Sequence, residues 1–312
     1  MTDNNKLTTV MYHYVRDLNK SKFPNIKGLD LALFNKQIDY LQARYNIVTI
    51  ESVINHIEGR HNLPSKPLLL TFDDGFADHY NNVFPVLMSR GIYACFYVSA
   101  KSIVEKIVLD VHKLHFILAS SSIKSLIYKI KKLLDRYRSE HELEEFDFYY
   151  NKLAQPSRLD NKDIIFVKRL LQVELEEEVR HLIVKDLFIE YVSDDEESFS
   201  KELYMDIFQL KHMVKEGMHI GCHGYDHYWW NSLDNNKLKD ELDLSLSFLS
   251  KIGFNKNYWT ACYPYGSYDR QSIRMLKERR CKLAFTTDVG MYDLNPLDRL
   301  KVSRFDTNDF GS

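Results

Sequence analysis

Two adjacent carboxylates and two spaced histidines are the residues of this sequence whose types and spacing could do chemistry. Asp73 and Asp74 directly follow the apolar run LLLTF, and His223 and His227 stand four residues apart in IGCHGYDHYWW. One carboxylate oxygen and two imidazoles form a three-ligand site with open positions for water and substrate, as in catalytic zinc centres. The pattern therefore predicts a metal site that brings these segments together.

Each half of the pattern also has an ordinary interpretation. An Asp-Asp-Gly tripeptide is a common turn, and a single histidine in a loop is commonly a turn or surface residue. Neighbouring carboxylates repel each other, however, and are costly to desolvate at the end of a core strand. A glycosidase acid pair is disfavoured, because adjacent residues of a strand point to opposite sides. The joint occurrence of both pairs after strand-like runs favours the metal site.

The elements that must position these residues follow from hydrophobic periodicity. Strands are expected at 6–15, 46–50, 66–72, 92–100 and 281–287, with a strand that runs into a loop at 218–227 and a strand and turn at 257–266. Helices are expected at 29–45, 51–59, 81–91, 204–217, 233–253 and 269–280. Strands that alternate with helices at this spacing indicate an α/β fold with a parallel sheet, as in a barrel. Catalytic groups of such folds collect at the carboxyl ends of the strands.

Residues 101–200 interrupt this alternation. The segment SIKSLIYKIKKLLDRYR is helical and basic, whereas VELEEEVRHLIVKDLFIEY is helical and acidic. Solvated helix faces explain such charge runs more simply than binding patches do. The expected organisation is a single α/β domain over 1–312 that contains a mostly helical insertion at 101–200.

Composition excludes several classes of protein. The 312 residues are 45% hydrophobic and have a formal charge of −2. Because the net charge is slightly negative, electrostatic binding to nucleic acid is not expected. The four cysteines contain no C-x-x-C pattern, which argues against a disulfide framework or a cysteine zinc site. The sequence has no apolar stretch of about 18–20 residues and no signal region at its start, so we expect a cytoplasmic protein without a transmembrane segment.

The motifs TFDDG, HGYDH and YPYG together resemble those of the NodB-type polysaccharide deacetylases, carbohydrate esterase family 4. The phrases MYHYV and FPVLMSRGIYACFYV fit this resemblance, which covers about residues 7–100 and 203–305. It implies a distorted (β/α) barrel of the polysaccharide deacetylase type, with the helical insertion outside the resemblance. It also implies a metal-dependent N-deacetylase that hydrolyses the acyl amide of an N-acylated amino sugar.

The resemblance assigns roles to the residues of the first two motifs. Asp74, His223 and His227 would be ligands of one divalent ion, which could be Zn²⁺, Co²⁺ or Ni²⁺. Asp73 would be the general base that takes a proton from the attacking water. The cation would also explain the doubled acid, because it neutralises Asp74.

The remaining roles concern the oxyanion and the leaving amine. Pro264 and Tyr265 of YPYG would lie at the substrate, with a backbone N–H near Tyr265 holding the oxyanion. The late histidine motif that supplies the family's general acid is absent after Tyr265. In circularly permuted relatives the corresponding strand lies at the N-terminus, so His13 of MYHYV is either this acid or an ordinary core histidine.

Two positions depart from the family's motifs. Gly224 stands where the second motif usually has Ser or Thr, so the hydroxyl that braces the loop is missing. Cys262 stands where the third motif usually has the arginine that orients the catalytic aspartate. Arg304 of KVSRFD is a candidate to replace that arginine.

The substrate expectation follows from the absence of an export signal. We expect a nucleotide- or lipid-linked acetamido sugar in surface-polysaccharide (O-antigen or capsule) biosynthesis. Two alternatives stay open at this point. The chain could be a catalytically inactive carbohydrate-binding protein, or a hydrolase of a non-sugar amide or imide on the same scaffold.

Overall fold

The computed structural model describes residues 6–157 and 160–310. The chain forms two compact units. We call Met1–Asp17, Gly28–Ile107 and Ser200–Ser312 the barrel unit, and Leu18–Lys27 with Val108–Phe199 the helical unit. Val108–Phe199 lies within the stretch 101–200 that was expected to be an insertion, and the ten-residue segment Leu18–Lys27, which was not expected there, belongs to the same unit.

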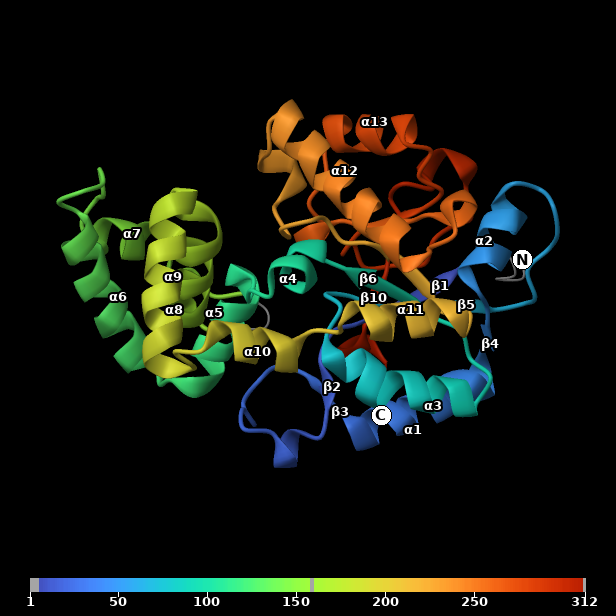
Figure 1. Ribbon diagram of the computed structural model, residues 1–312, viewed down its shortest axis with the longest axis horizontal. Coiled ribbons are helices and arrows are strands. Elements are labelled where there is room, and N and C mark those ends of the chain that lie inside the picture. The colour runs from blue at the N-terminus through green and yellow to red at the C-terminus, as the bar shows by residue number, and fades with distance from the viewer. Residues whose placement is uncertain (1–5, 158–159, 311–312) are drawn as a thin grey trace. The chain divides into compact units, whose positions relative to one another are not determined.

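A parallel sheet forms the centre of the barrel unit (Figure 1). Its strands run in the order β10-β1-β5-β6-β7-β8-β9, with β4 beside β5. The bounds are β1 Thr8–Tyr12, β4 Asn46–Ile47, β5 Pro67–Phe72, β6 Cys95–Val98, β7 His219–Cys222, β8 Ala261–Cys262, β9 Ala284–Phe285 and β10 Phe305–Asp306. The described pairings within this sheet are all parallel. The predicted α/β fold with a parallel sheet is confirmed.

The sheet curls towards closure. β9 forms a parallel bridge from Phe285 to Val302, and the chain then enters β10, which pairs with β1. The series of neighbouring strands therefore leads from β9 through the segment at Val302 and β10 back to β1, along a short and irregular edge. This arrangement is the predicted distorted barrel.

Helices surround these strands on the outside (Figure 1). They are α1 Leu31–Arg44, α2 Ile50–Ile57, α3 Phe84–Ser89, α4 Ala100–Glu105, α11 Ile207–Lys215, α12 Asn235–Ile252 and α13 Arg270–Glu278. Helix α1 shows why they form: Asp30 caps its first turn, and Phe34, Ile38 and Leu41 on one face are buried in the core.

Several expected elements differ in the structure. The strand expected from residue 257 begins only at Ala261, after the 3-10 helix η5 (Lys256–Tyr258), and Ile50 begins α2 in place of ending a strand. The first strand ends at Tyr12, and Val15–Arg16 forms a separate strand β2 that pairs with β3 (Leu29–Asp30). The helix expected from residue 81 begins earlier as a π-helix, η2 (His79–Val83), which continues into α3. The physical reason for these last two differences is that side chains of η2 bind the segment after β1, with His79 at the carbonyl of His13 and Asn82 at the carbonyl of Val15.

The register of the strands places the site residues at one edge. Tyr12 pairs with Phe72, Phe72 with Phe96, and Val98 with Cys222. Asp73 and His223 each follow one of these paired residues directly, so both emerge at the carboxyl edge of the sheet. This is the edge at which sites of parallel α/β folds form.

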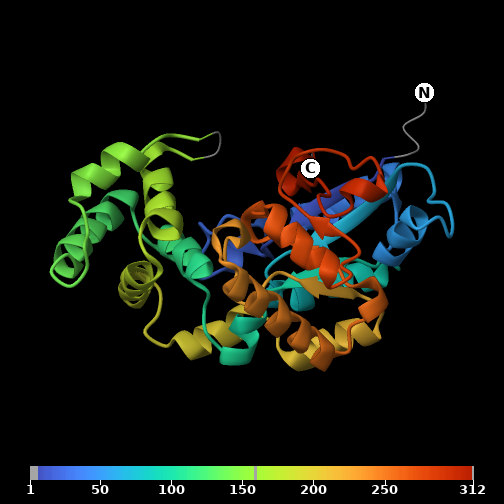
Figure 2. The ribbon, with the colours of Figure 1, turned by 90° about the horizontal axis from the view of Figure 1, so that it is seen from above.

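The helical unit consists of helices that pack against one another (Figure 2). They are α5 Asp110–Ser120, α6 Ile123–Tyr137, α7 Phe146–Leu153, α8 Lys162–Arg169, the π-helix η3 Leu170–Glu174, α9 Glu177–Tyr191 and the first half of α10 Glu196–Leu203. The segment 18–27 joins them because the Phe23 ring packs against Phe116 and Phe199. Over the described residues, the structure contains no helix with the length and apolarity that a membrane crossing requires.

Candidate metal centre

Three side chains of the barrel unit converge on one point. Nε2 of His223 and Nε2 of His227 lie 3.4 and 3.3 Å from the same oxygen, Oδ1 of Asp74. All three residues are buried, and their ligand atoms lie within 4.8 Å of one another. Two imidazole nitrogens and a carboxylate oxygen that face one another are the donor set of a divalent ion such as Zn²⁺. The sequence-predicted ligands are therefore brought together, and they fit such an ion.

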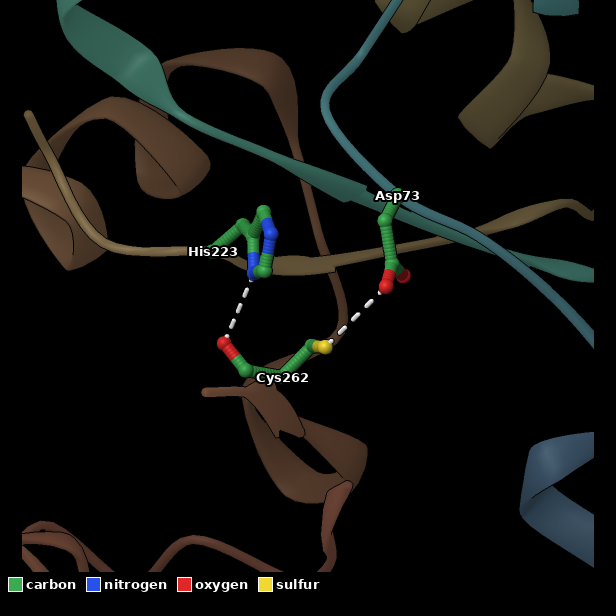
Figure 3. Close-up of side chains that lie close together, drawn as sticks. All are labelled: Asp73, His223 and Cys262. Atoms are coloured by element: carbon green, nitrogen blue, oxygen red, sulfur yellow. Dashed lines mark hydrogen bonds between the residues drawn. The ribbon is translucent and has the colours of Figure 1, made fainter. Parts of the chain in front are cut away.

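A hydrogen bond behind His223 sets which nitrogen faces the cluster. Nδ1 of His223 lies 2.8 Å from the backbone oxygen of Cys262 (Figure 3), so this nitrogen carries the proton and donates. Nε2 then keeps its lone pair on the side of Asp74. Metal-binding histidines characteristically make such a second bond to a carbonyl or carboxylate.

Three of the seven non-glycine residues with positive φ in the described part of the chain lie at this cluster. Asp74, His227 and Tyr265 have φ angles of 79°, 58° and 58°, the left-handed region that non-glycine residues seldom adopt. Such conformations cost about 1–3 kcal/mol each and persist where the surroundings enforce them, above all at functional sites. The strain supports a functional interpretation of all three residues.

The loop between the two histidines is held by a carboxylate from α12. Glu241 accepts hydrogen bonds from the backbone N–H groups of Tyr225 (2.9 Å) and Asp226 (3.0 Å). A Cβ atom on Gly224 would lie 2.8 Å from Oε2 of Glu241, and Gly224 has a φ of 75°. Glycine is thus required here, and Glu241 braces the loop that the missing hydroxyl was expected to leave loose.

The N-terminus of α4 holds the other side of the same loop. The backbone N–H groups of Ala100 and Lys101 donate to the carbonyls of Gly224 (3.3 Å) and Tyr225 (2.9 Å). The Lys101 ammonium forms an ion pair with Asp226. Donors and acceptors on both sides of the loop are therefore engaged, which favours a rigid loop.

Asp73 is held by Arg304, the residue expected as a replacement for the family's arginine. The guanidinium binds both carboxylate oxygens, with Nη1–Oδ1 at 3.0 Å and Nη2–Oδ2 at 2.8 Å. Both residues are 1% exposed. Burial alone would raise the pKa of Asp73, but the charge of Arg304 beside it outweighs burial and holds that pKa below its usual value. Asp73 is consequently ionised at neutral pH.

Cys262 fills the place beside Asp73 where the family's arginine would stand. Its Sγ lies 3.4 Å from Oδ2 of Asp73 (Figure 3) and 3.0 Å from Nη2 of Arg304. Asp73, His223 and Cys262 also have ligand atoms within 4.8 Å of one another. A cation there would meet the Arg304 charge, and both Asp73 oxygens already accept from Arg304. The donor set with Asp74 is the better metal site.

His13 follows the strand that neighbours β5, as its predicted role requires. The backbone N–H of Asp73 donates to the carbonyl of Tyr12 (2.9 Å), so His13 and Asp73 emerge side by side at the same sheet edge. The side chain of His13 is half-buried. A distance of roughly 8 Å or less from His13 to the metal position stays a prediction.

Tyr265 forms one wall of the site. Its ring lies 4.7 Å from that of His227, edge to face, and stacks on Trp229 at 4.3 Å with an interplanar angle of 6°. Pro264 is buried and begins the turn in which Tyr265 adopts its left-handed conformation. The substrate and oxyanion roles of Pro264 and Tyr265 stay predictions.

Two neighbours of the site were not singled out from the sequence. Trp229 lies two residues after His227, so its position in HGYDHYWW was a usable signal. Glu241 had no such signal, because it lies in the middle of an amphipathic helix among other charged residues. Burial raises the pKa of Glu241 to about 7, which marks an acid placed where ionisation is costly.

Comparisons with known proteins agree with this geometry. Residues 60–145 and 202–283 match the family described as polysaccharide deacetylase, which is more than half of the chain. A comparison with curated protein sequences gives no match.

Solved structures with the same fold include several deacetylases. The Streptococcus pyogenes deacetylase PplD, solved in complex with acetate, aligns with a TM-score of 0.58 and 15% identity, over 96% of this chain and 92% of its own. IcaB from Ammonifex degensii aligns with a TM-score of 0.56 and 20% identity, over 97% and 92%. A de-N-acetylase from Aggregatibacter actinomycetemcomitans aligns with a TM-score of 0.56 and 15% identity, over 98% and 97%. At these identities the similarity confirms the fold.

Proposed function

The chain belongs to the polysaccharide deacetylase family, whose members are hydrolases of carbon–nitrogen bonds in acetylated sugars, and from this premise we propose that it is a metal-dependent N-deacetylase of an N-acylated amino sugar. The observation that carries the proposal is the convergence of Asp74, His223 and His227 beside an ionised Asp73. A catalytically inactive binding protein would not need this complete set of ligands and base.

Asp74, His223 and His227 would hold the divalent ion, with Zn²⁺, Co²⁺ or Ni²⁺ as candidates. When bound, such an ion neutralises the charge of Asp74, polarises the acyl carbonyl and makes a nearby water more acidic. The fixed tautomer of His223 and the braced loop support this assignment, because the ligands need no rearrangement to bind.

The residues around the ligands would carry out the proton transfers. Asp73 takes a proton from the attacking water, whose oxygen then bonds to the acyl carbon. The backbone N–H at Tyr265 would stabilise the developing oxyanion, with Pro264 shaping that turn. His13 would donate a proton to the sugar nitrogen as the carbon–nitrogen bond breaks, which releases the free amine and a carboxylate.

We also propose that Arg304 positions Asp73 in place of the family's arginine. Its planar fork binds both carboxylate oxygens and restricts rotation of the side chain. The remaining N–H groups of Arg304 donate to Thr71 (3.1 Å) and to the carbonyl of Thr286 (2.8 Å), so the guanidinium itself is held. Cys262 fits in the remaining space because it is small.

The finer part of the proposal is the substrate. We propose a nucleotide- or lipid-linked acetamido sugar of surface-polysaccharide (O-antigen or capsule) biosynthesis, modified in the cytoplasm. Family membership supports the sugar, whereas the carrier and the compartment are part of the proposal that the assay below tests. Hydrolysis of a non-sugar amide is the alternative that a substrate panel separates from it.

The test is an assay of released amine against a panel of acetamido sugars, free, nucleotide-linked and lipid-linked, with a simple amide as the non-sugar member. We expect turnover on at least one sugar, loss of turnover with a chelator, and recovery with Zn²⁺, Co²⁺ or Ni²⁺. Bound metal without turnover on any sugar would instead support the carbohydrate-binding function. Chelator-resistant turnover would contradict metal dependence.

His13→Ala tests the general acid separately. We expect a rate about 10²–10⁴-fold lower with unchanged metal content, because the leaving amine loses its proton donor while the ligands stay in place. Metal content by elemental analysis and initial rates on the same samples are the measurements. An unchanged rate would assign His13 to the core and the acid to another residue.

A further inference from the structure

The segment that contains His13 is held by an unusual turn. The π-helix η2 begins four residues after Gly75 and makes an i to i+5 hydrogen bond, from the N–H of Phe84 to the carbonyl of His79. Such turns contain one residue more than an α-helical turn and occur frequently at functional sites. The side chains that this turn presents contact the segment between β1 and α1.

Three side chains at this turn bind consecutive parts of residues 13–16. Nε2 of His79 lies 2.8 Å from the carbonyl oxygen of His13, and Nδ2 of Asn82 donates to the carbonyl of Val15 at 2.8 Å. Asp78 accepts from Nε of Arg16 at 2.8 Å, and both of these side chains are 15% exposed. These side-chain contacts add to the pairing of β2 with β3, and they join residues 13–16 to the turn at η2.

The surroundings of His79 are otherwise aromatic. It is fully buried, and its ring lies 5.5, 5.7 and 5.8 Å from those of Phe72, Phe76 and Phe96. Burial lowers the pKa of His79 to about 4, so the ring is neutral at ordinary pH. A neutral imidazole has one N–H, and the bond to a carbonyl oxygen places it on Nε2.

A polar ring in such a place needs a reason. Among the described residues Nδ1 of His79 is buried without a hydrogen-bond partner, and an unsatisfied buried group opposes folding. An apolar ring would fill the same aromatic pocket without this penalty. What the histidine adds is one directed hydrogen bond, to the carbonyl of the residue proposed as the general acid.

We propose that His79, supported by Asp78 and Asn82, is a positioning residue that fixes the backbone of His13 so that its imidazole reaches the leaving nitrogen. The bond holds the peptide plane after His13 and thereby restricts the direction of its side chain. A misplacement on the order of 1 Å can lower a rate about 10²-fold. This inference rests on the role of His13 under the proposed function.

The experiment compares two substrates that differ in their need for an acid. One is an N-acetyl amino sugar that the enzyme turns over, whose alkylamine must be protonated to leave. The other is an activated aryl acetamide, whose weakly basic amine leaves with less help. His79→Phe keeps the ring and removes the donor, and His79→Gln keeps a donor that can take the place of Nε2.

We expect His79→Phe to lower kcat on the amino sugar about 10–100-fold, to change the aryl acetamide much less, and to leave metal content unchanged. His79→Gln should recover most of the loss. In the double variant with His13→Ala, the His79→Phe change should have almost no further effect, because both act through one proton transfer. An equal loss on both substrates, or losses that multiply in the double variant, would overturn the proposal.

Two outcomes separate this inference from the proposed function. A His13→Ala variant with a normal rate would refute the assignment of His13 as the acid, and with it the positioning role of His79. If the His13→Ala variant has a lower rate and the His79→Phe variant has a normal rate, only the positioning role of His79 is refuted. If His79→Phe does not fold, Asn82→Ala is the second variant, which removes the hydrogen bond from the half-buried Asn82 side chain to Val15. We expect it to lower kcat on the amino sugar more than on the aryl acetamide, by a smaller factor than His79→Phe does. Absence of this difference between the substrates would contradict the proposal.

Discussion

Asp73→Asn is expected to lower turnover about 10²–10⁴-fold while the protein keeps its metal. Asparagine has nearly the shape of aspartate but cannot accept a proton from water at neutral pH. The metal ligands come from other residues, so their geometry should survive the change. Turnover is measured per bound metal ion, with metal content taken from elemental analysis of the same sample.

The same substitution should also lower stability, and the assay must allow for it. Arg304 is fully buried and would lose its counterion, and breaking a buried ion pair costs about 3–5 kcal/mol. The asparagine oxygen, Thr71 and Thr286 still accept from the guanidinium, which reduces this loss. Thermal unfolding therefore accompanies the kinetics, so that only folded, metal-loaded protein is compared.

A matched control for this variant is Asp243→Asn. Asp243 is also a carboxylate paired with an arginine, Arg279 at 2.8 Å, but it is half exposed on α12. Exposed pairs of this kind contribute about 0–1 kcal/mol, so activity and stability should stay close to wild type. If Asp73→Asn loses its metal together with its activity, Asp73 is a ligand and its assignment as the base is wrong.

His227→Ala is expected to abolish metal binding and, with it, nearly all turnover. Removing one of three protein ligands should weaken affinity more than the 10–100-fold typical of residues behind the ligands. Affinity is measured by competition with a chromophoric chelator. Asp74→Asn should also weaken binding, in contrast to Asp73→Asn, because an amide oxygen carries no charge to neutralise the ion.

Backbone strain must be separated from ligand loss in this experiment. His227 has a φ of 58°, where alanine is strained whereas asparagine is tolerated. His227→Asn therefore removes the ligand without adding strain, and it should lose metal as fully as His227→Ala does. His212→Ala, on the exposed side of α11, is the control for general effects of losing a histidine. Retention of metal by both His227 variants would show that the site lies elsewhere.

Local patterns in the sequence predicted most strands and helices of the barrel unit to within a few residues, but not β3, β10 or α4. The continuous apolar run located β5, which is buried on both faces, and the apolar face of α1 located that helix. The sequence pattern overextended the first strand past Tyr12, since Val15 continues the β-prone composition after the pairing with β5 has ended. It also missed the π-turn at His79, whose reason is a contact with a segment more than 60 residues away.

The sequence by itself indicated the family, the parallel fold and the residues of the candidate metal centre, because Asp74, His223 and His227 lie in short motifs at the ends of strands. Only the tertiary structure decided how those residues are held. Arg304 reaches Asp73 across 231 positions of sequence, and Glu241 enters from α12 to fill the space that Gly224 leaves. Arg304 could be named from the sequence as a candidate, whereas Glu241 had no local signature. Neither contact could be read from the sequence, since both exist only after the sheet has curled and brought distant segments to one edge.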